Sequence, residues 1–181
     1  MTKFINQFLI LCACMLAFSS CEKNTIDIPL SSVTIELDDI VVDDGSHSKS
    51  TMNPFSFTQT ISSATIKGLT DDAKKYKSRI QSMSADTVFI TITTTDGVGT
   101  VVENFTLKAE DLFTYPIPQY HLGTAYTDSQ LTDYAVQLLK KIMTDDSVNI
   151  SILGETDVPS GDHLKITITM KDVVMAAKII N

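Results

Sequence analysis

The chain has 181 residues, with 22 acidic against 14 basic side chains and a formal net charge of −8. This acidic balance argues against nucleic acid and anionic lipid as ligands, and otherwise serves solubility. The length fits one domain with a hydrophobic core of its own. The sequence has three cysteines, no tryptophan and no Cys/His metal-binding spacing, so we expect no cofactor.

The first 21 residues resemble the signal peptide of a bacterial lipoprotein. Lys3 provides a positive charge, and an apolar run of eleven residues follows from Phe8 to Phe18. This run is too short for a transmembrane helix, which needs about 20 apolar residues. The small residues Ser19-Ser20 precede Cys21, as in the lipobox of that family. The resemblance implies a signal peptide at residues 1–20 and acylation of Cys21.

A second cysteine competes for this role. Leu11-Cys12-Ala13-Cys14 fits the lipobox letter for letter, whereas Phe18 stands where the lipobox before Cys21 usually has Leu. Cleavage at Cys14 would leave an apolar segment on the mature chain, and the polar residues 22–24 after Cys21 favour the later site. The segment could also be an ordinary cleaved signal peptide or an uncleaved anchor. Cys12 and Cys14 leave with the signal peptide, so no disulfide is expected.

Residues 21–31 show no periodicity, which indicates a tether between the lipid and a single globular domain at residues 32–181. Apolar and polar residues alternate over Ser32–Val42, with an interruption at Asp38-Asp39, and again over Asn53–Ser62. Period-two alternation of this kind is typical of half-buried strands. Both stretches are therefore predicted strands.

Two stretches predict amphipathic helices. Thr70 has the position of an N-cap, and apolar residues at 4-3-4-3 spacing predict a helix over Thr70–Ser82. Thr127 and Gln130 have the spacing of a capping box, and the apolar pattern after them predicts a helix to Asp145. Four basic residues lie off the apolar face of the first helix and form either a positive patch or a solvated face: Lys74, Lys75, Lys77 and Arg79.

The clearest strand is predicted at Thr87–Thr95, where β-branched residues dominate. Asp96-Gly97 follows it and predicts a hairpin with Val101–Lys108. Two prolines in Glu110–Tyr126 exclude a helix and predict an extended loop.

Two more strands close the chain. Val148–Ile152 alternates, and Gly154–Gly161 predicts a hairpin loop before a long strand over Leu164–Ile179. The apolar phase of that last strand changes at Lys171-Asp172, which indicates a bulge. The order ββ-α-ββ-α-ββ predicts an α+β fold, mainly β: an antiparallel β-sandwich-like domain with two amphipathic helices.

Three stretches, Phe55–Phe57, Val88–Thr95 and Val148–Met170, resemble uncharacterised outer-membrane lipoproteins of Bacteroidota. The resemblance implies an outer-membrane lipoprotein without assigned activity. Surface-displayed lipoproteins of that group often carry an acidic or Lys-acidic stretch after the cysteine. Residues 22–24 match it in part, so display on the surface and on the periplasmic face both stay open.

Acidic and aromatic clusters are the candidate ligand sites. The carboxylates of Asp38, Asp39, Asp43 and Asp44 suit a hard cation such as calcium, and the alternative is a charged strand edge that discourages pairing between molecules. Four aromatic residues of the Pro-containing loop could stack on a sugar or a partner chain, or else close the end of the sheet: Phe113, Tyr115, Tyr120 and Tyr126.

Two short motifs, at residues 86–88 and 146–148, resemble the Asp-Ser/Thr-apolar signal that Bacteroidota use for O-glycosylation of exported proteins. The resemblance implies modification of Thr87 and Ser147, and ordinary strand entry is the alternative.

Catalytic motifs are not found. His47, His121 and His163 lie in separate contexts without a nucleophile signature, so no catalytic residue is predicted. We expect a non-catalytic, lipid-anchored envelope protein that binds an unknown protein or glycan or has a structural role. The alternatives are a carrier of an apolar ligand, with an adaptable methionine-containing interior, and a glycan-acting enzyme with paired carboxylates.

Overall fold

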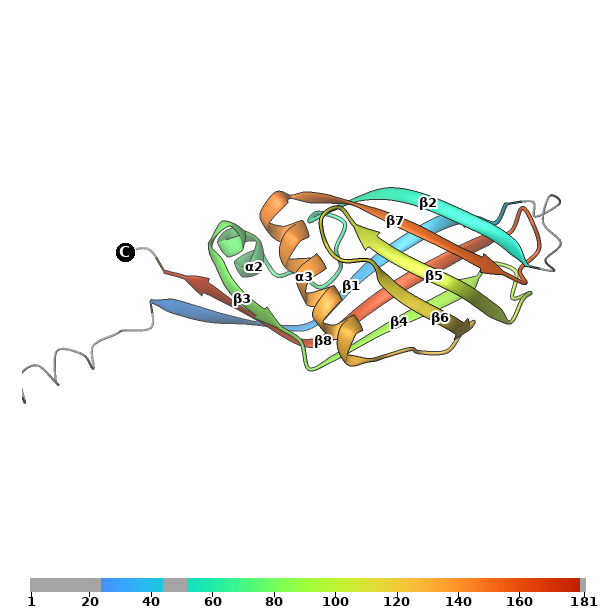
Figure 1. Cartoon of the computed structure of the whole chain (residues 1–181). Coiled ribbons are helices and arrows are strands. Elements are labelled where there is room, and N and C mark those ends of the chain that lie inside the picture. Colours follow the sequence, from blue (N-terminus) through green and yellow to red (C-terminus); the bar gives the residue numbers. More distant parts are fainter. Residues whose placement is uncertain (1–23, 44–51, 180–181) are drawn as a thin grey trace, which may run out of the picture.

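The computed structural model describes residues 24–43 and 52–179 (Figure 1). The elements in chain order are β1 (Thr25–Val41), β2 (Asn53–Ser62), α2 (Asp71–Tyr76), the 3₁₀ turn η1 (Lys77–Arg79), β3 (Ile80–Ser84), β4 (Thr87–Thr94), β5 (Val101–Ala109), β6 (Tyr115–His121), α3 (Ser129–Asp145), β7 (Ser147–Thr156) and β8 (His163–Lys178). The predicted class, α+β and mainly β, is confirmed.

The strands form two antiparallel sheets. In sheet A, the long strand β8 is central, with β1 along one side and β3 and β4 end to end along the other. Sheet B has the order β2-β7-β5-β6. Sheet A is longer than sheet B, and the helices α3 and then α2 cover the part of sheet A that extends beyond it (Figure 1).

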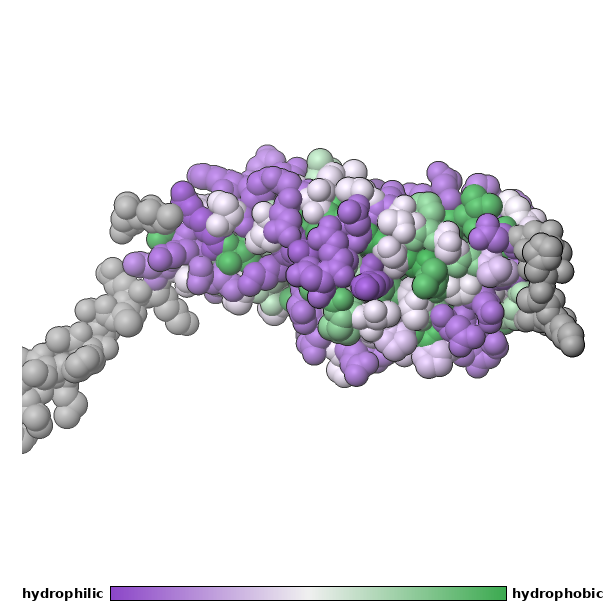
Figure 2. All heavy atoms as spheres, turned by 45° about the horizontal axis from the view of Figure 1, so that its top comes forward, coloured by the Kyte–Doolittle hydropathy of each residue, from purple (hydrophilic) through white to green (hydrophobic). Residues whose placement is uncertain are grey.

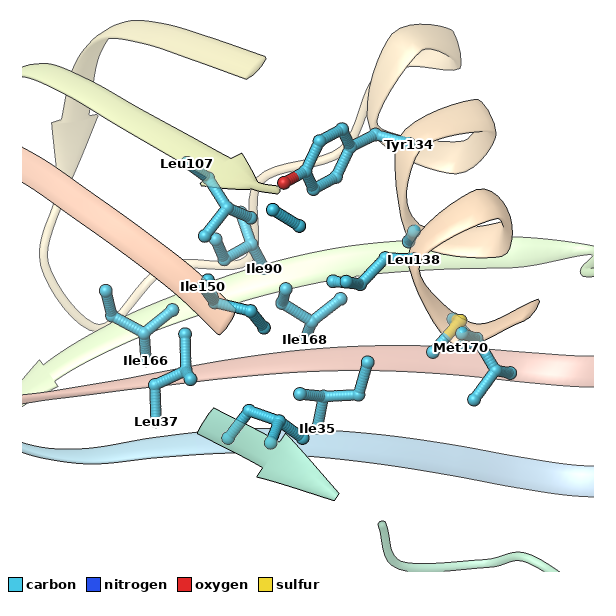
Figure 3. Close-up of a cluster of buried hydrophobic side chains, with 14 of the residues drawn as sticks. Ile35, Leu37, Ile90, Leu107, Tyr134, Leu138, Ile150, Ile166, Ile168 and Met170 are labelled. Carbon is cyan, nitrogen blue, oxygen red and sulfur yellow. The ribbon is translucent and has the colours of Figure 1, made fainter. Parts of the chain in front are cut away.

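The core lies between the two sheets and beneath α3. Alternate residues of the facing strands are buried, including Ile35, Ile168 and Ile150. Tyr134 and Leu138 of α3 point into the same cluster (Figure 3). Because period-two strands bury one face and α3 adds its apolar stripe, the hydrophobic pattern alone specifies which sides pack together.

The domain begins earlier in the chain than the sequence predicted. Thr25–Ser31 belong to β1, so the expectation of a tether through residue 31 is wrong for these residues. The alternation was hidden because Ile28 and Leu30 are buried in one phase and Val33 and Ile35 in the other. A strand that changes phase looks aperiodic to a pattern search.

The predicted phase change in β8 is confirmed, and β1 shares it. Met170 and Val173 are both buried, and Asp172 between them has a φ of 49°. The pairs Val33↔Met170 and Leu30↔Val173 keep one register, because β1 changes phase at the same place. The junction between β3 and β4 also lies there. We call this line across sheet A the crease.

The first predicted helix is shorter than expected. Thr70 caps α2 as predicted, accepting a hydrogen bond from the Ala73 N–H at 3.2 Å. The helix ends at Tyr76, and the remainder of the predicted helix is η1 and β3. Ile80 is buried opposite Ala177 of β8. Pairing with a long central strand therefore overrides the helical pattern in this stretch.

Neither predicted hairpin forms. Asp96-Gly97 joins β4 of sheet A to β5 of sheet B. Gly154–Gly161 contains the end of β7 of sheet B and most of the link to β8 of sheet A. Both turns carry the chain from one sheet to the other. Turn residues report a reversal of direction but do not say whether the two strands pair.

The predicted loop Glu110–Tyr126 contains the strand β6, which was missed. β6 is an edge strand of sheet B, and its two prolines are exposed. Proline is tolerated at an edge, because its missing N–H faces away from the ladder. The following helix ends at Asp145 as predicted, but its N-cap is Asp128 in place of Thr127.

Candidate binding hollow at the far end of the domain

The described chain begins and ends at the same end of the molecule. Ile179 donates its N–H to the Asn24 carbonyl at 2.7 Å, and both lie at the outer end of sheet A (Figure 1). The start of β2 and the end of β7 lie at the opposite end. We call this opposite end the far end.

A hollow of about 400 Å³ lies at the far end, on sheet B. We call it the far-end hollow, and it is lined by Asp43, Pro54, Phe55, Ser56, Asn104, Leu153, Gly154 and Glu155. Its lining comes from the segment just after β1, the start of β2, β5 and the end of β7. The hollow therefore combines two carboxylates, an amide and a hydroxyl with apolar surface.

A bulge in β5 positions the amide. The register between β5 and β7 shifts between Glu103 and Thr106, and Asn104 has a φ of 50°. Asparagine tolerates this left-handed conformation better than most residues. Its Nδ2 donates to Glu155 Oε2 at 3.2 Å. Bulges of this kind re-aim a side chain out of the regular alternation.

Apolar surface completes the hollow. Phe55 is only 2% exposed and lies opposite Gly154, where an added Cβ would be 2.5 Å from the Phe55 Cζ. Leu153 is 56% exposed and stands among polar cross-strand neighbours such as Ser56. An exposed leucine encircled by hydrogen-bonding groups suits a ligand with both hydroxyl groups and an apolar face. The lining residues include no histidine, cysteine or lysine.

The four predicted stacking aromatics lie elsewhere, and most of them point inward. Tyr115 and Tyr120 are buried, Tyr126 is half-buried and Phe113 is 45% exposed. Phe113 packs edge-on against Tyr134 of α3, with ring centroids 5.2 Å apart. The rings of Tyr115 and Tyr120 therefore have no face available for stacking on a sugar.

Two of these tyrosines bind one carboxylate. The hydroxyls of Tyr115 and Tyr126 donate to Asp128 Oδ2 at 2.8 and 3.0 Å, and Asp128 Oδ1 accepts the Leu131 N–H at 2.6 Å. Burial and the nearby carboxylate raise the pKa of both tyrosines. Partial burial would raise the pKa of Asp128, but its hydrogen bonds outweigh this and lower it. We call this group the tyrosine–aspartate cluster.

The predicted calcium ligands do not form a site in the part of the chain that the structure describes. Asp38 forms an ion pair with Lys165 at 3.0 Å, and Asp39 lies at the irregularity of β1 with a φ of 59°. Asp43 lines the far-end hollow, and Asp44 lies outside the described residues. Within residues 24–43 and 52–179, no group of three His, Cys, Asp or Glu side chains could hold a metal ion.

The remaining predicted residues lie at strand starts, in the core or outside the described part of the chain. Thr87 and Ser147 are exposed and are the first residues of β4 and β7. Cys21 and the signal segment lie outside the described residues. The described helices are all too short or too polar to cross a membrane. Met143, Met170 and Met175 are buried in the core.

Sequence reasoning missed the far-end hollow. One signal was present: Leu153 occupies the phase of Asn149 and Ser151, which is the solvent-facing phase of β7. An apolar residue in a polar phase marks surface that a ligand could cover. Asn104 gave no signal, because a bulge of one residue is not visible in a short strand.

Comparison with protein-family models, with curated proteins and with solved structures found no match to this chain.

Proposed function

We propose that this protein is a non-catalytic lipoprotein of the bacterial outer membrane that binds a glycan in its far-end hollow. The observation that carries the binding proposal is Leu153, which is 56% exposed and shares the hollow with four polar residues: Asp43, Ser56, Asn104 and Glu155. Carboxylate and amide groups exchange hydrogen bonds with sugar hydroxyls, and leucine packs against the C–H face of a sugar ring. The two carboxylates of the hollow, Asp43 and Glu155, are not buried, which favours binding over the paired acid and nucleophile of a glycan-acting enzyme.

Acylation of Cys21 is the second part of the proposal. The support is the signal segment, with its apolar run and the small residues before the cysteine. Because Thr25, the first residue of β1, follows Cys21 closely, a lipid on Cys21 would lie near the end of the domain where the chain begins. The far-end hollow would then face away from the bilayer, open to ligands.

Binding is tested with glycan arrays and calorimetry on the purified protein. Leu153→Ser and Glu155→Gln should each weaken binding of a glycan at least tenfold. Val98→Ser is the matched control, because Val98 is equally exposed, at 52%, but does not line the hollow. The proposal fails if no glycan binds, or if Val98→Ser weakens binding as much as Leu153→Ser. Binding of an extended peptide in place of a glycan would also overturn the choice of ligand.

Anchoring is tested separately. The acylated protein should be labelled by palmitate and stay with membranes through high-salt washing, since apolar burial is not screened by salt. Cys21→Ser should abolish labelling. Labelling that persists in Cys21→Ser would place the lipid on Cys14 instead.

We also propose O-glycosylation of Thr87 and Ser147, supported by their motifs and by their exposure at the starts of two strands.

A further inference from the structure

The part of sheet A beyond the crease has a surface unlike the rest of the domain. We call it the tip and define it as residues 25–31, 70–84 and 172–179. It contains the start of β1, the end of β8, β3 and the helical turns of α2 and η1. In Figure 2 this end is mostly hydrophilic, with small apolar areas between the polar side chains.

The charge of the tip departs from that of the whole molecule. The tip holds five of the eleven described basic residues but only four of the twenty described acidic residues. The rest of the described chain is therefore strongly acidic, while the tip is slightly basic. The overall charge of −8, which argues against anionic lipid for the molecule as a whole, does not describe this end.

The basic side chains of the tip are available to a ligand. Four of them are exposed and form no ion pair within the described residues: Lys74, Lys75, Arg79 and Lys178. Of the six described basic residues outside the tip, Lys67, Lys141 and Lys165 each bind at least one carboxylate, and the other three form no ion pair within the described residues: Lys108, Lys140 and Lys171. The two acidic residues of α2 lie in its first turn. This first turn is the end of α2 nearer the crease, because Thr70 lies beside Val173. Arg79 lies farther out, beside the outer pair Ile80↔Ala177.

Apolar side chains are exposed at the same place. Ile26 and Ile179 are each 38% exposed, and Val174 is 36% exposed. Ile26 pairs with Ala177, which also pairs with the buried Ile80, so Ile26 extends a buried apolar row to the outer end of the sheet. Exposed aliphatic side chains beside unpaired basic groups are typical of surfaces that lie in a membrane interface.

The chain enters the domain at the tip. Asn24 is only three residues after Cys21, and an extended residue spans about 3.3–3.6 Å, so at most about 11 Å separates the two. If Cys21 carries lipid, the tip cannot leave the bilayer surface by more than a short distance. Such tethering gives even weak contacts a high effective concentration.

We propose that the tip is a docking surface for a phospholipid bilayer that contains phosphatidylglycerol. Ile26 and Ile179 enter the boundary between headgroups and acyl chains, and the four unpaired basic side chains contact lipid phosphates. This proposal rests on the proposed lipid anchor and adds an orientation to it. The long axis of the domain then stands away from the membrane, with the far-end hollow outermost.

The test measures how close two sites lie to lipid. The acylated protein is reconstituted in vesicles with and without phosphatidylglycerol, carrying an environment-sensitive fluorophore on Ile26→Cys. Val98→Cys at the far end is the matched control, since Val98 is also exposed. A quencher attached to the lipid acyl chains should reduce the fluorescence at position 26 at least fivefold more than at position 98. The difference should shrink at least twofold when Lys74→Glu and Lys178→Glu are combined, or when phosphatidylglycerol is omitted.

The docking proposal fails if quenching is equal at positions 26 and 98. It also fails if neither the charge-reversal variants nor the omission of phosphatidylglycerol changes the quenching. Mass spectrometry shows independently whether Cys21 carries lipid. If it does not, the tip is tested with a chain that starts at residue 22 and is held on nickel-chelating lipid by an N-terminal histidine tag. All described core residues lie between Ile28 and Ala177, so this chain keeps the described core. Preferential quenching at position 26 would then support the tip without the anchor, and its absence would refute the tip.

Discussion

Replacement of Asp128 by alanine should be one of the most destabilising polar substitutions in this protein. One oxygen of Asp128 caps α3 through the Leu131 N–H, and the other accepts hydrogen bonds from Tyr115 and Tyr126. A lost N-cap costs about 1 kcal/mol. Hydrogen bonds to a charged group contribute about 1.5–3 kcal/mol each, and we take the low end because Asp128 is only half-buried. The free energy of unfolding should therefore fall by about 3–4 kcal/mol.

The matched control is Asp128→Asn. Asparagine is as good an N-cap as aspartate, but its amide oxygen is neutral and binds the two tyrosine hydroxyls less strongly. We expect a loss of about 1–2 kcal/mol, so the two variants separate the cap from the charge. Urea unfolding measures both, with the change in midpoint converted at constant m. In thermal unfolding the alanine variant should melt about 10 °C lower than wild type.

The charge of Asp128 also predicts a pH dependence. Its pKa is lowered in the folded state, because the hydrogen bonds outweigh partial burial. A lowered pKa stabilises the fold above the unfolded-state value, about 3.9, and this stabilisation is lost as pH falls through the folded value. The advantage of wild type over Asp128→Asn should therefore be constant from pH 5 to 8 and shrink below about pH 4. The reasoning is refuted if Asp128→Ala costs less than about 0.5 kcal/mol, or if the two variants are equally stable at pH 7.

Three further predictions follow from single contacts. Tyr120→Phe should lower the free energy of unfolding by about 1–3 kcal/mol in urea melts, because the buried hydroxyl accepts an N–H of β4 at 2.9 Å; an unchanged midpoint would contradict this. Gly154→Ala should cost about 1–3 kcal/mol, because the new methyl group meets the Phe55 ring, and Phe55→Leu in the same chain should recover part of that loss. If the Asp-Ser/Thr motifs are used after folding, glycopeptide mass spectrometry should find higher occupancy at Thr87 than at Ser147. The reason is that Asp146 is held by Lys77, whereas within the described residues the Asp86 carboxylate contacts only the Thr87 hydroxyl. Equal occupancy would indicate modification before folding.

Strands with regular alternation could be predicted from the sequence, and those that depend on distant partners could not. β4 and the main part of β8 show clean period-two patterns, and the structure has both. The first residues of β3 belong to an apparently helical stretch, and they form a strand because β8 offers them an edge. The pattern also carries no record of which strands pair, so both turns that cross between the sheets were interpreted as hairpins.

Site prediction met the same limit. Aromatic residues near two prolines looked like exposed loop residues, but β6 places Tyr115 and Tyr120 on its buried face. The far-end hollow depends on Asn104, whose left-handed conformation arises from a bulge that only the pairing of β5 with β7 defines. Leu153 alone was visible in advance, as an apolar residue in a polar phase.

The position of β8 at the centre of sheet A has a consequence for how the chain folds. β1, β3 and β4 pair with β8 and not with one another, so the ladder of sheet A needs the last strand of the sequence. Thr25 pairs with Lys178, which makes the loop between partners nearly as long as the domain. Closing such a loop is slow, and contacts of this range delay folding. In sheet B, β5 can pair with β6 as soon as both are made, but β2 has no described partner strand before β7. Sheet A of a nascent chain would thus form only after β8 is made, so folding of this sheet should follow synthesis of the chain and not accompany it.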